Sequence, residues 1–451
     1  MEPSEKSFIP AIRQLIAEDK LEQALELLRL KLSGEPLLDE ALHQSGRFQY
    51  IRKQIRLGIV SFEDANLTQN QIRFGLLDLL SEMEQEGQAP LPPQVAQDLI
   101  TEGSSWPDNL KQQLEKYGPV GNRPVSIFQH YGWLIEEFLR KMETPSGRER
   151  SLRRLSFMAE AFQNSLRYLC FIQLAQILKM EKAPQHPLLQ EYLNMDEQIH
   201  TGFDYLILLL VCTDILNGEE TFIPEIGQIV AELSDTGSDL YGAVIFLHTN
   251  RQQLLNNGFA HDEKLNALLD EYLTALVFWL CRLAFLYEYR LVSIKEINLK
   301  FRLGMDRFFV HHYGELHGVY SSEDFDYADF PIKDLFTYNH SVLLFRGSDM
   351  RECLKNLHDE SAYISLSPLV IDQSVFAQKE TQTPEVYYFT GHSERQYHFA
   401  LYKNELALAG TTETPFNKFL VVREKNINQP KLNDLYEQLE QVFSPFKTPA
   451  I

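Results

Sequence analysis

Arg307 and His312 are the residues whose types and spacing could support phosphate chemistry. His312 lies five positions after Arg307 in the segment RFFVHH, with four residues between them. An arginine can hold the negative charge on a scissile phosphate while a histidine transfers a proton, so the pair could cleave RNA. The surrounding residues alternate between apolar and polar, which predicts a strand with Arg307 and His312 on opposite faces. We therefore predict a structural strand here.

The same spacing resembles the R-x-x-x-x-H motif of a family of helical RNases. That resemblance implies a histidine in proton transfer and an arginine that holds charge. Two features depart from the motif, because Phe308 stands where the family usually has a polar residue and because the segment is predicted to be extended. An effector RNase that uses Arg307 and His312 is kept as an alternative function.

Other catalytic and ligand-binding motifs are absent from the sequence. It contains no phosphate-binding loop pattern, G-x-x-x-x-G-K-[ST] or G-x-G-x-x-G, and no G-x-S-x-G motif of serine nucleophiles. His311, His312 and His317 lack the fixed spacing of a metal site. The acidic segment 322–329 lacks the glycine and final glutamate of a calcium loop, so we predict an exposed loop. The sequence therefore predicts a non-enzyme without a metal or cofactor.

A basic segment stands out in this acidic chain, whose formal net charge is −21. Residues 45–58 contain four cations and no acid. Phe48, Ile51 and Ile55 recur at helical spacing and should be buried, which leaves the cations on the exposed faces. A basic surface on an acidic protein favours docking to another protein, and a solvated helix is the alternative. The predicted partner-binding residues are Arg47, Tyr50, Arg52, Lys53 and Arg56.

Four regions are predicted to position these residues. Residues 1–86 have the pattern of short helices, and residues 87–124 form a linker that contains Pro and Gly. Residues 125–289 have broad apolar helical faces, which predict a bundle. In residues 290–451 the apolar period changes to two, which predicts an antiparallel sheet with a packing helix. The expected fold is mainly α in the N-terminal and middle parts and α+β in the C-terminal part.

Composition and hydropathy indicate the cellular compartment in which the protein is expected. The first residues lack the basic start and apolar core of a signal peptide, and the run from Leu206 to Cys212 is far below the roughly 20 apolar residues of a bilayer span. The four cysteines are far apart, which is typical of reduced thiols. Strong acidity disfavours contacts with nucleic-acid phosphates. We expect a cytoplasmic protein without a membrane span that does not bind nucleic acid.

The first region resembles a known family of domains. The segments IRQLIAEDKLEQALELL, SGRFQYIRKQIRLGIVSFED and NQIRFGLLDLL are similar to the effector-associated domains of bacterial conflict systems, specifically the eleventh numbered type. The resemblance covers residues 1–86 and implies a small helical adaptor that pairs with like domains on proteases, nucleotide-hydrolysing switches or toxin-like effectors. Parts of residues 157–369 are similar to uncharacterised regions of bacterial signalling and defence proteins, which favours a sensor or regulatory module.

The function predicted from these features is a non-catalytic adaptor or sensor-scaffold of a bacterial antiviral system. It would recruit an effector such as a protease through its N-terminal helical domain, and self-association is a further expectation. Two alternatives stay open: the effector RNase described above, and a regulatory module whose middle and C-terminal parts sense a small ligand.

Overall fold

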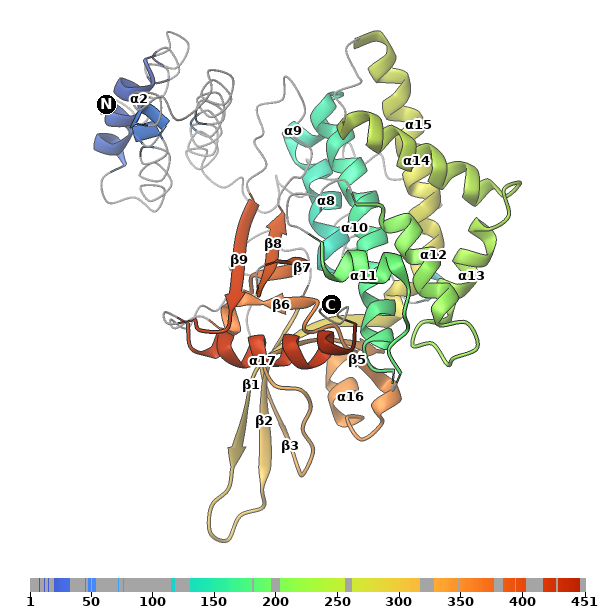
Figure 1. Cartoon of the computed structure of the whole chain (residues 1–451), viewed down its shortest axis with the longest axis vertical. Coiled ribbons are helices and arrows are strands. Elements are labelled where there is room, and N and C mark those ends of the chain that lie inside the picture. Colours follow the sequence, from blue (N-terminus) through green and yellow to red (C-terminus); the bar gives the residue numbers. More distant parts are fainter. Residues whose placement is uncertain are drawn as a thin grey trace, which may run out of the picture. The chain divides into compact units, whose positions relative to one another are not determined.

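The computed structural model of the chain divides into two compact units (Figure 1). The first unit comprises residues 1–103 and 407–416, and the second comprises residues 104–406 and 417–451. The structure describes residues 8, 12, 15, 20–32, 45, 48–49, 51–53, 72 and 76 in the first unit, and residues 115–117, 130–180, 182–195, 203–255, 262–316, 328–347, 349–376, 384–393, 395–402, 417–426 and 429–446 in the second. Apart from residues 115–117, the predicted linker lies outside these ranges, and the four predicted regions stay a prediction.

The first unit has its core around helix α2 (Leu21–Lys31). The apolar residues of α2 recur three and four positions apart, so they share one buried face. The basic segment contributes Phe48 and Ile51 to the same core, as their spacing predicts, whereas Ile55 lies outside the described residues. The buried cluster consists of Ile12, Leu21, Ala24, Leu25, Leu28, Leu32, Phe48, Ile51, Ile72 and Leu76.

Helices make up the first half of the second unit, as predicted. They are α8 (Trp133–Glu143), α9 (Pro145–Arg148), α10 (Leu152–Ile177), α11 (Pro187–Leu193), α12 (Tyr205–Ile215), α13 (Pro224–Leu233), α14 (Asp239–Leu255), α15 (Asp262–Arg282) and the 3-10 helix η2 (Ala284–Glu288). Among the helices that the structure describes, none is both long enough and apolar enough to cross a membrane.

Helix α10 is the centre of this bundle (Figure 1). It contacts α8, α12, α14 and α15, and every residue from Arg154 to Ala175 is buried. Its first turn is capped by Ser151, whose Oγ accepts a hydrogen bond from the N–H of Arg154 at 3.4 Å. Because α10 is enclosed on all sides, its polar side chains must find partners inside the protein.

Two antiparallel sheets follow the helices, where the sequence predicted one. The first has the order β3-β2-β1-β4-β5 and consists of β1 (Tyr289–Lys300), β2 (Phe308–Glu315), β3 (Ala328–Ile332), β4 (Ser341–Arg346) and β5 (Tyr363–Ser365). The second has the order β6-β7-β8-β9 and consists of β6 (Val370–Asp372), β7 (Val386–Ser393), β8 (Gln396–Tyr402) and β9 (Asn417–Arg423). Short helices between strands are α16 (Met350–Lys355), η4 (Glu360–Ala362) and η5 (Gln373–Val375). The predicted fold class, α followed by α+β, is confirmed.

The separation into two sheets divides residues 363–371, whose largely apolar pattern by itself predicts one strand. The chain turns after β5, where the N–H groups of Leu369 and Val370 donate to the carbonyl oxygen of Leu366 at 2.9 and 3.1 Å. Pro368 lies in this turn and has no N–H to give to a strand ladder. The segment 363–371, which is apolar except for Ser365 and Ser367, therefore becomes two short strands in different sheets.

The acidic segment 322–329, predicted as an exposed loop, also needs a correction at its end. Ala328 and Asp329 begin β3, which pairs with β2 in the register Tyr313↔Ala328 and His312↔Asp329. Residues 322–327 lie outside the described part of the chain. The sequence concealed β3 because acidic residues and Pro331 are typical of loops, and an edge strand tolerates both.

The closing helix α17 (Lys431–Phe443) packs on the second sheet, as predicted, and is followed by η6 (Ser444–Phe446) (Figure 1). The ring of Phe443 lies 5.2 Å from that of Phe389 on β7 and 5.8 Å from that of Tyr397 on β8. The buried Tyr397 hydroxyl donates to Glu440 Oε1 at 2.6 Å, so its polar end is paired within the apolar contact.

Replacing Asp204 with alanine should cost about 1 kcal/mol at pH 7, because this carboxylate caps α12. Oδ1 accepts from the N–H groups of Leu206 and Ile207 at 3.0 and 3.1 Å, and Oδ2 lies 3.4 Å from Nε2 of His248 on α14. Burial alone would raise the pKa of Asp204, but the hydrogen bonds from His248 and the two N–H groups outweigh it and lower that pKa.

The folded state therefore binds this proton less tightly than the unfolded state, and the stabilisation by Asp204 depends on pH. It should be complete above the ordinary aspartate pKa of about 4 and disappear as the pH falls through the lower folded-state value. Urea unfolding of wild type and Asp204→Ala between pH 3 and 7 measures this difference. A difference that is constant over that range would contradict the assignment.

Candidate functional site

The predicted docking residues fall partly within the described chain. Arg52 and Lys53 are described, whereas Arg47, Tyr50 and Arg56 lie outside the described residues. Lys53 is exposed, as the amphipathic pattern predicts.

Arg52 has partners within its own domain. It forms an ion pair with Glu22 of α2, and its guanidinium carbon lies 5.6 Å from the ring centroid of Phe48. Its side chain keeps 42 % of its surface exposed, so a partner can still contact it. This pairing is not evident from the sequence, because Arg52 and Glu22 are 30 positions apart.

Arg307 and His312, the candidate nuclease pair, lie on an extended segment, and each has a different acidic partner. Arg307 directly precedes β2, and its Nη2 lies 3.6 Å from Asp334 Oδ1. His312 is in β2, and its Nδ1 lies 2.9 Å from Oδ1 of Asp329 in β3. At the rise of an extended chain, five residues span roughly 16 Å. The strand prediction is therefore confirmed. The RNase alternative is supported only by the presence of an arginine and a histidine, and not by their arrangement.

The neighbouring His311 is buried in β2, and burial lowers its pKa. In the part of the chain that the structure describes, no group of three or more His, Cys, Asp or Glu side chains could hold a metal ion.

A buried polar network joins the helical bundle to the second sheet. Arg167, in the middle of α10, is fully buried, and its Nη1 donates to Asn164 Oδ1 at 2.7 Å and to the Tyr388 hydroxyl at 2.8 Å. The guanidinium carbon lies 4.5 Å from the ring centroid of Tyr388 and 4.8 Å from that of Tyr205. Because Tyr388 is on β7, Arg167 fixes the position of α10 on the sheet.

The network extends along α10 and across to α15. The amide nitrogen of Asn164 donates to the carbonyl oxygen of Glu160 at 2.9 Å, and Trp279 Nε1 on α15 donates to Ser165 Oγ at 2.7 Å. Sequence reasoning missed these residues, because polar residues within a helical apolar pattern are ordinarily assigned to the solvent face. Their described hydrogen bonds join parts of the fold to one another, so the network positions the helices.

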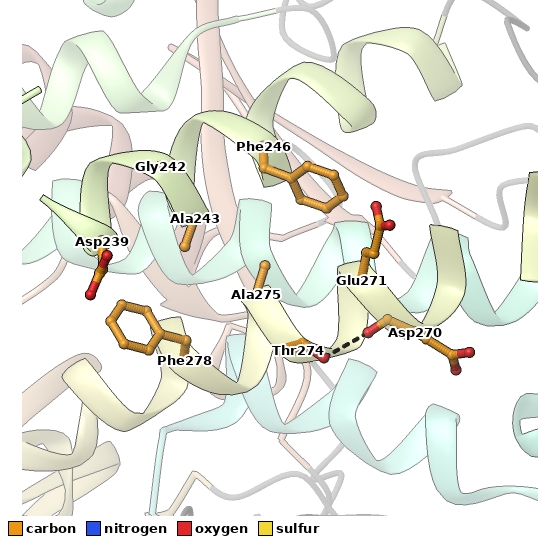
Figure 2. Close-up of a pocket in the computed structure, with 9 residues that line it drawn as sticks. All are labelled: Asp239, Gly242, Ala243, Phe246, Asp270, Glu271, Thr274, Ala275 and Phe278. Atoms are coloured by element: carbon orange, nitrogen blue, oxygen red, sulfur yellow. Dashed lines mark hydrogen bonds between the residues drawn. The ribbon is translucent and has the colours of Figure 1, made fainter. Parts of the chain in front are cut away.

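A groove between α14 and α15 is a largely apolar hollow on the described surface (Figure 2). Its volume is about 610 Å³, and small residues form its floor. Figure 2 shows Ala243 and Ala275 facing each other between Phe246 and Phe278. Carboxylates stand at the rim, where Asp239 and Glu271 are exposed. The arrangement fits an apolar side chain that is flanked by positive charge.

Other charges near the groove are already paired. Both carboxylate oxygens of Asp270 accept hydrogen bonds from Arg150, from Nη1 at 3.0 Å and from Nη2 at 2.8 Å. Arg282 lies over the Phe278 ring, and its Nη2 lies 2.7 Å from Glu232 Oε1. Asp239 and Glu271 are therefore the acids of the rim best placed to meet a cation from outside.

A second, more polar hollow lies between α12 and α13. Its volume is about 460 Å³, and Thr213, Asp214 and Asn217 contribute polar atoms to its lining. Its polar atoms make this hollow the first place to look for a bound small ligand. The ligand-sensing alternative stays a prediction.

Comparison with known proteins assigns the N-terminal segment. Residues 7–84 match the family model of effector-associated domain 11. A curated relative, a Roc-COR-CHAT protease from an unknown prokaryotic organism, is 32 % identical over 85 residues, which are 19 % of this chain and 8 % of the relative. The chain therefore spans less than a tenth of that relative's length. No solved structure matches the chain. The N-terminal segment of this protein is an effector-associated domain of the eleventh type.

Proposed function

We propose that this protein is a non-catalytic adaptor of a bacterial antiviral system that works in the cytoplasm. Its effector-associated domain would dock a like domain on a separate effector, such as a protease or a nucleotide-hydrolysing switch. The second unit would serve as the sensor or scaffold.

The observation that carries this proposal is the match of residues 7–84 to effector-associated domain 11. The relative whose name includes a protease resembles this chain over only 85 residues, so the similarity does not extend to the bulk of either protein. Two proteins that bind each other through paired like domains need to share only that small domain, and these two chains are similar over no more than that. The charge contrast adds support, because Arg52 and Lys53 present positive charge on a chain with a net charge of −21.

The proposal predicts that reversing the basic face abolishes recruitment. In a pull-down, the variant Arg47→Glu/Arg52→Glu/Lys53→Glu/Arg56→Glu should bind at least about tenfold less partner than wild type. The reason is that charges at a docking surface steer the first encounter and fix how the two proteins align. The partner would be a protease from the same genome that carries an effector-associated domain of this type. Wild-type binding should also weaken as salt is raised, since exposed charges are screened.

Two controls separate lost docking from lost folding. Because Arg52 pairs with Glu22, a second form that adds Glu22→Lys keeps an opposite charge at that contact. The variant Lys182→Glu/Lys425→Glu reverses two exposed cations of the second unit and should bind like wild type. Equal binding by the fourfold variant removes this surface from the proposal. If the wild-type chain binds no such partner, the adaptor role itself is removed.

A further inference from the structure

The hairpin of β1 and β2 ends in an exposed apolar tip. Beyond Ile294, β1 pairs with β2 but no longer with β4. Figure 1 shows the end of the β1–β2 hairpin extending away from the helices. The tip turns at Gly304, where φ is +81° and the Met305 N–H donates to the Arg302 carbonyl oxygen at 3.0 Å. Four large apolar side chains of the tip are between 56 % and 104 % exposed: Leu299, Phe301, Leu303 and Met305.

Cations alternate with these apolar residues. Lys300 and Arg302 stand between them along the chain, and none of the ion pairs in the described part of the protein includes either. The cations nearer the base of the hairpin do have acidic partners. Arg307 Nη2 lies 3.6 Å from Asp334 Oδ1, and Lys333 Nζ lies 2.9 Å from Asp306 Oδ2. The tip therefore presents apolar side chains together with uncompensated positive charge, a combination that marks an interaction surface.

The groove between α14 and α15 has the complementary character. Its floor and walls are apolar, and Asp239 and Glu271 place negative charge at its rim. An added Cβ on Gly242, which lines it, would meet no atom within 4 Å, so the groove is open at that point. The tip is exposed and the groove is open in the same chain, so neither fills the other within one molecule.

We propose that the hairpin tip of one copy of this chain inserts into the α14–α15 groove of a second copy. Phe301 and Leu303 would fill the groove between Phe246 and Phe278, while Lys300 and Arg302 meet Asp239 and Glu271. A second copy fits because every molecule carries both surfaces. An anionic membrane fits the tip less well, since a chain with a net charge of −21 is repelled by it.

The contact is heterologous, because the tip and the groove are different surfaces. Each copy that donates its tip leaves its own groove open, so the assembly can grow beyond a dimer into a ring or a filament. A single tip buries less than the roughly 1,200 Å² of a standard stable interface, so assembly should be weak and depend on concentration. This inference uses the second unit alone and does not rest on the recruitment proposed for the first.

Sedimentation velocity of the full chain from about 1 to 100 µM tests this assembly. Wild type should form dimers and larger species as its concentration rises. The tip variant Phe301→Ser/Leu303→Ser and the groove variant Gly242→Trp should each weaken association at least about tenfold, since both remove the central apolar contact. Glu271→Lys is a second groove variant that leaves the helix packing unchanged, and Gly227→Trp on α13 is the matched control that should associate like wild type.

Mixing the two disabled variants distinguishes this assembly from a symmetric dimer. The tip of the groove variant can still enter the groove of the tip variant, but the resulting pair has no second working interface. An equimolar mixture should therefore form a 1:1 dimer and stop there. A wild type that stays monomeric at every concentration overturns the proposal. Flotation of wild type with phosphatidylserine vesicles that is lost in the tip variant would also overturn it and assign the tip to a membrane.

Discussion

Replacing Arg167 with alanine is expected to lower the free energy of unfolding of the second unit by about 3–5 kcal/mol. The substitution leaves a cavity where a fully buried guanidinium lay against the rings of Tyr205 and Tyr388. It also removes the hydrogen bonds that Nη1 donates to Asn164 Oδ1 and to the Tyr388 hydroxyl. The loss of these buried hydrogen bonds adds to the cost of the cavity.

Tryptophan fluorescence during urea unfolding measures this effect in the right unit. All three tryptophans lie outside residues 1–103, and Trp279 is buried beside α10. Tyr388→Phe is the matched control, because it removes one hydrogen bond to Arg167 and keeps the ring, so it should cost only about 1 kcal/mol. Arg167→Lys should fall between the two, since lysine keeps the charge but loses the planar stacking. If Arg167→Ala costs no more than Tyr388→Phe, Arg167 does not hold the helices to the sheet.

Gly147→Ala is expected to destabilise the second unit by at least about 3 kcal/mol. A Cβ at this position would lie 1.9 Å from the carbonyl oxygen of Lys141 and 2.9 Å from its carbonyl carbon. These are backbone atoms of α8, which cannot move aside as a flexible side chain can. The backbone of Gly147 is held as well, because its N–H donates to Thr144 Oγ1 at 3.1 Å and its oxygen accepts from Arg154 at 2.9 Å.

Gly227→Ala is the control for this prediction, and it should have the opposite sign. Gly227 lies inside α13, and a Cβ there meets no atom within 4 Å. Alanine should stabilise the helix by about 0.5–1 kcal/mol through its better helix propensity. Both variants can be compared by thermal unfolding at one protein concentration. A Gly147→Ala protein as stable as wild type would mean that α8 and α9 are not packed as described.

The elements that the sequence predicted well have one buried face. The amphipathic pattern of the basic segment correctly placed Phe48 and Ile51 in the core, and the alternating residues around His312 correctly indicated a strand. Such patterns predict an element well because each of its faces lies in a single environment, either the core or the solvent. The same logic failed at residues 363–371, where an apolar run buried on both faces concealed the turn at Pro368.

The candidate site was predictable only in part, since docking depends on charge and packing together. The sequence identified Arg52 and Lys53 as cations on an exposed helix, but it could not assign Glu22 as the partner of Arg52. Nor could it predict the α14–α15 groove, because that hollow exists only where small residues of two separate helices, Ala243 and Ala275, face each other (Figure 2).

The sequence alone determined the α then α+β fold class and the effector-associated domain, because both depend on local periodicity and on a contiguous segment. Only the tertiary structure decided that Arg167 is a buried link between helix and sheet, that the apolar tip of the β1–β2 hairpin stays exposed, and that a groove with an acidic rim lies open on the same unit. The physical reason is that burial is a property of the assembled fold. A polar residue on a helix can face solvent or the core, and only the neighbours that pack around it decide which.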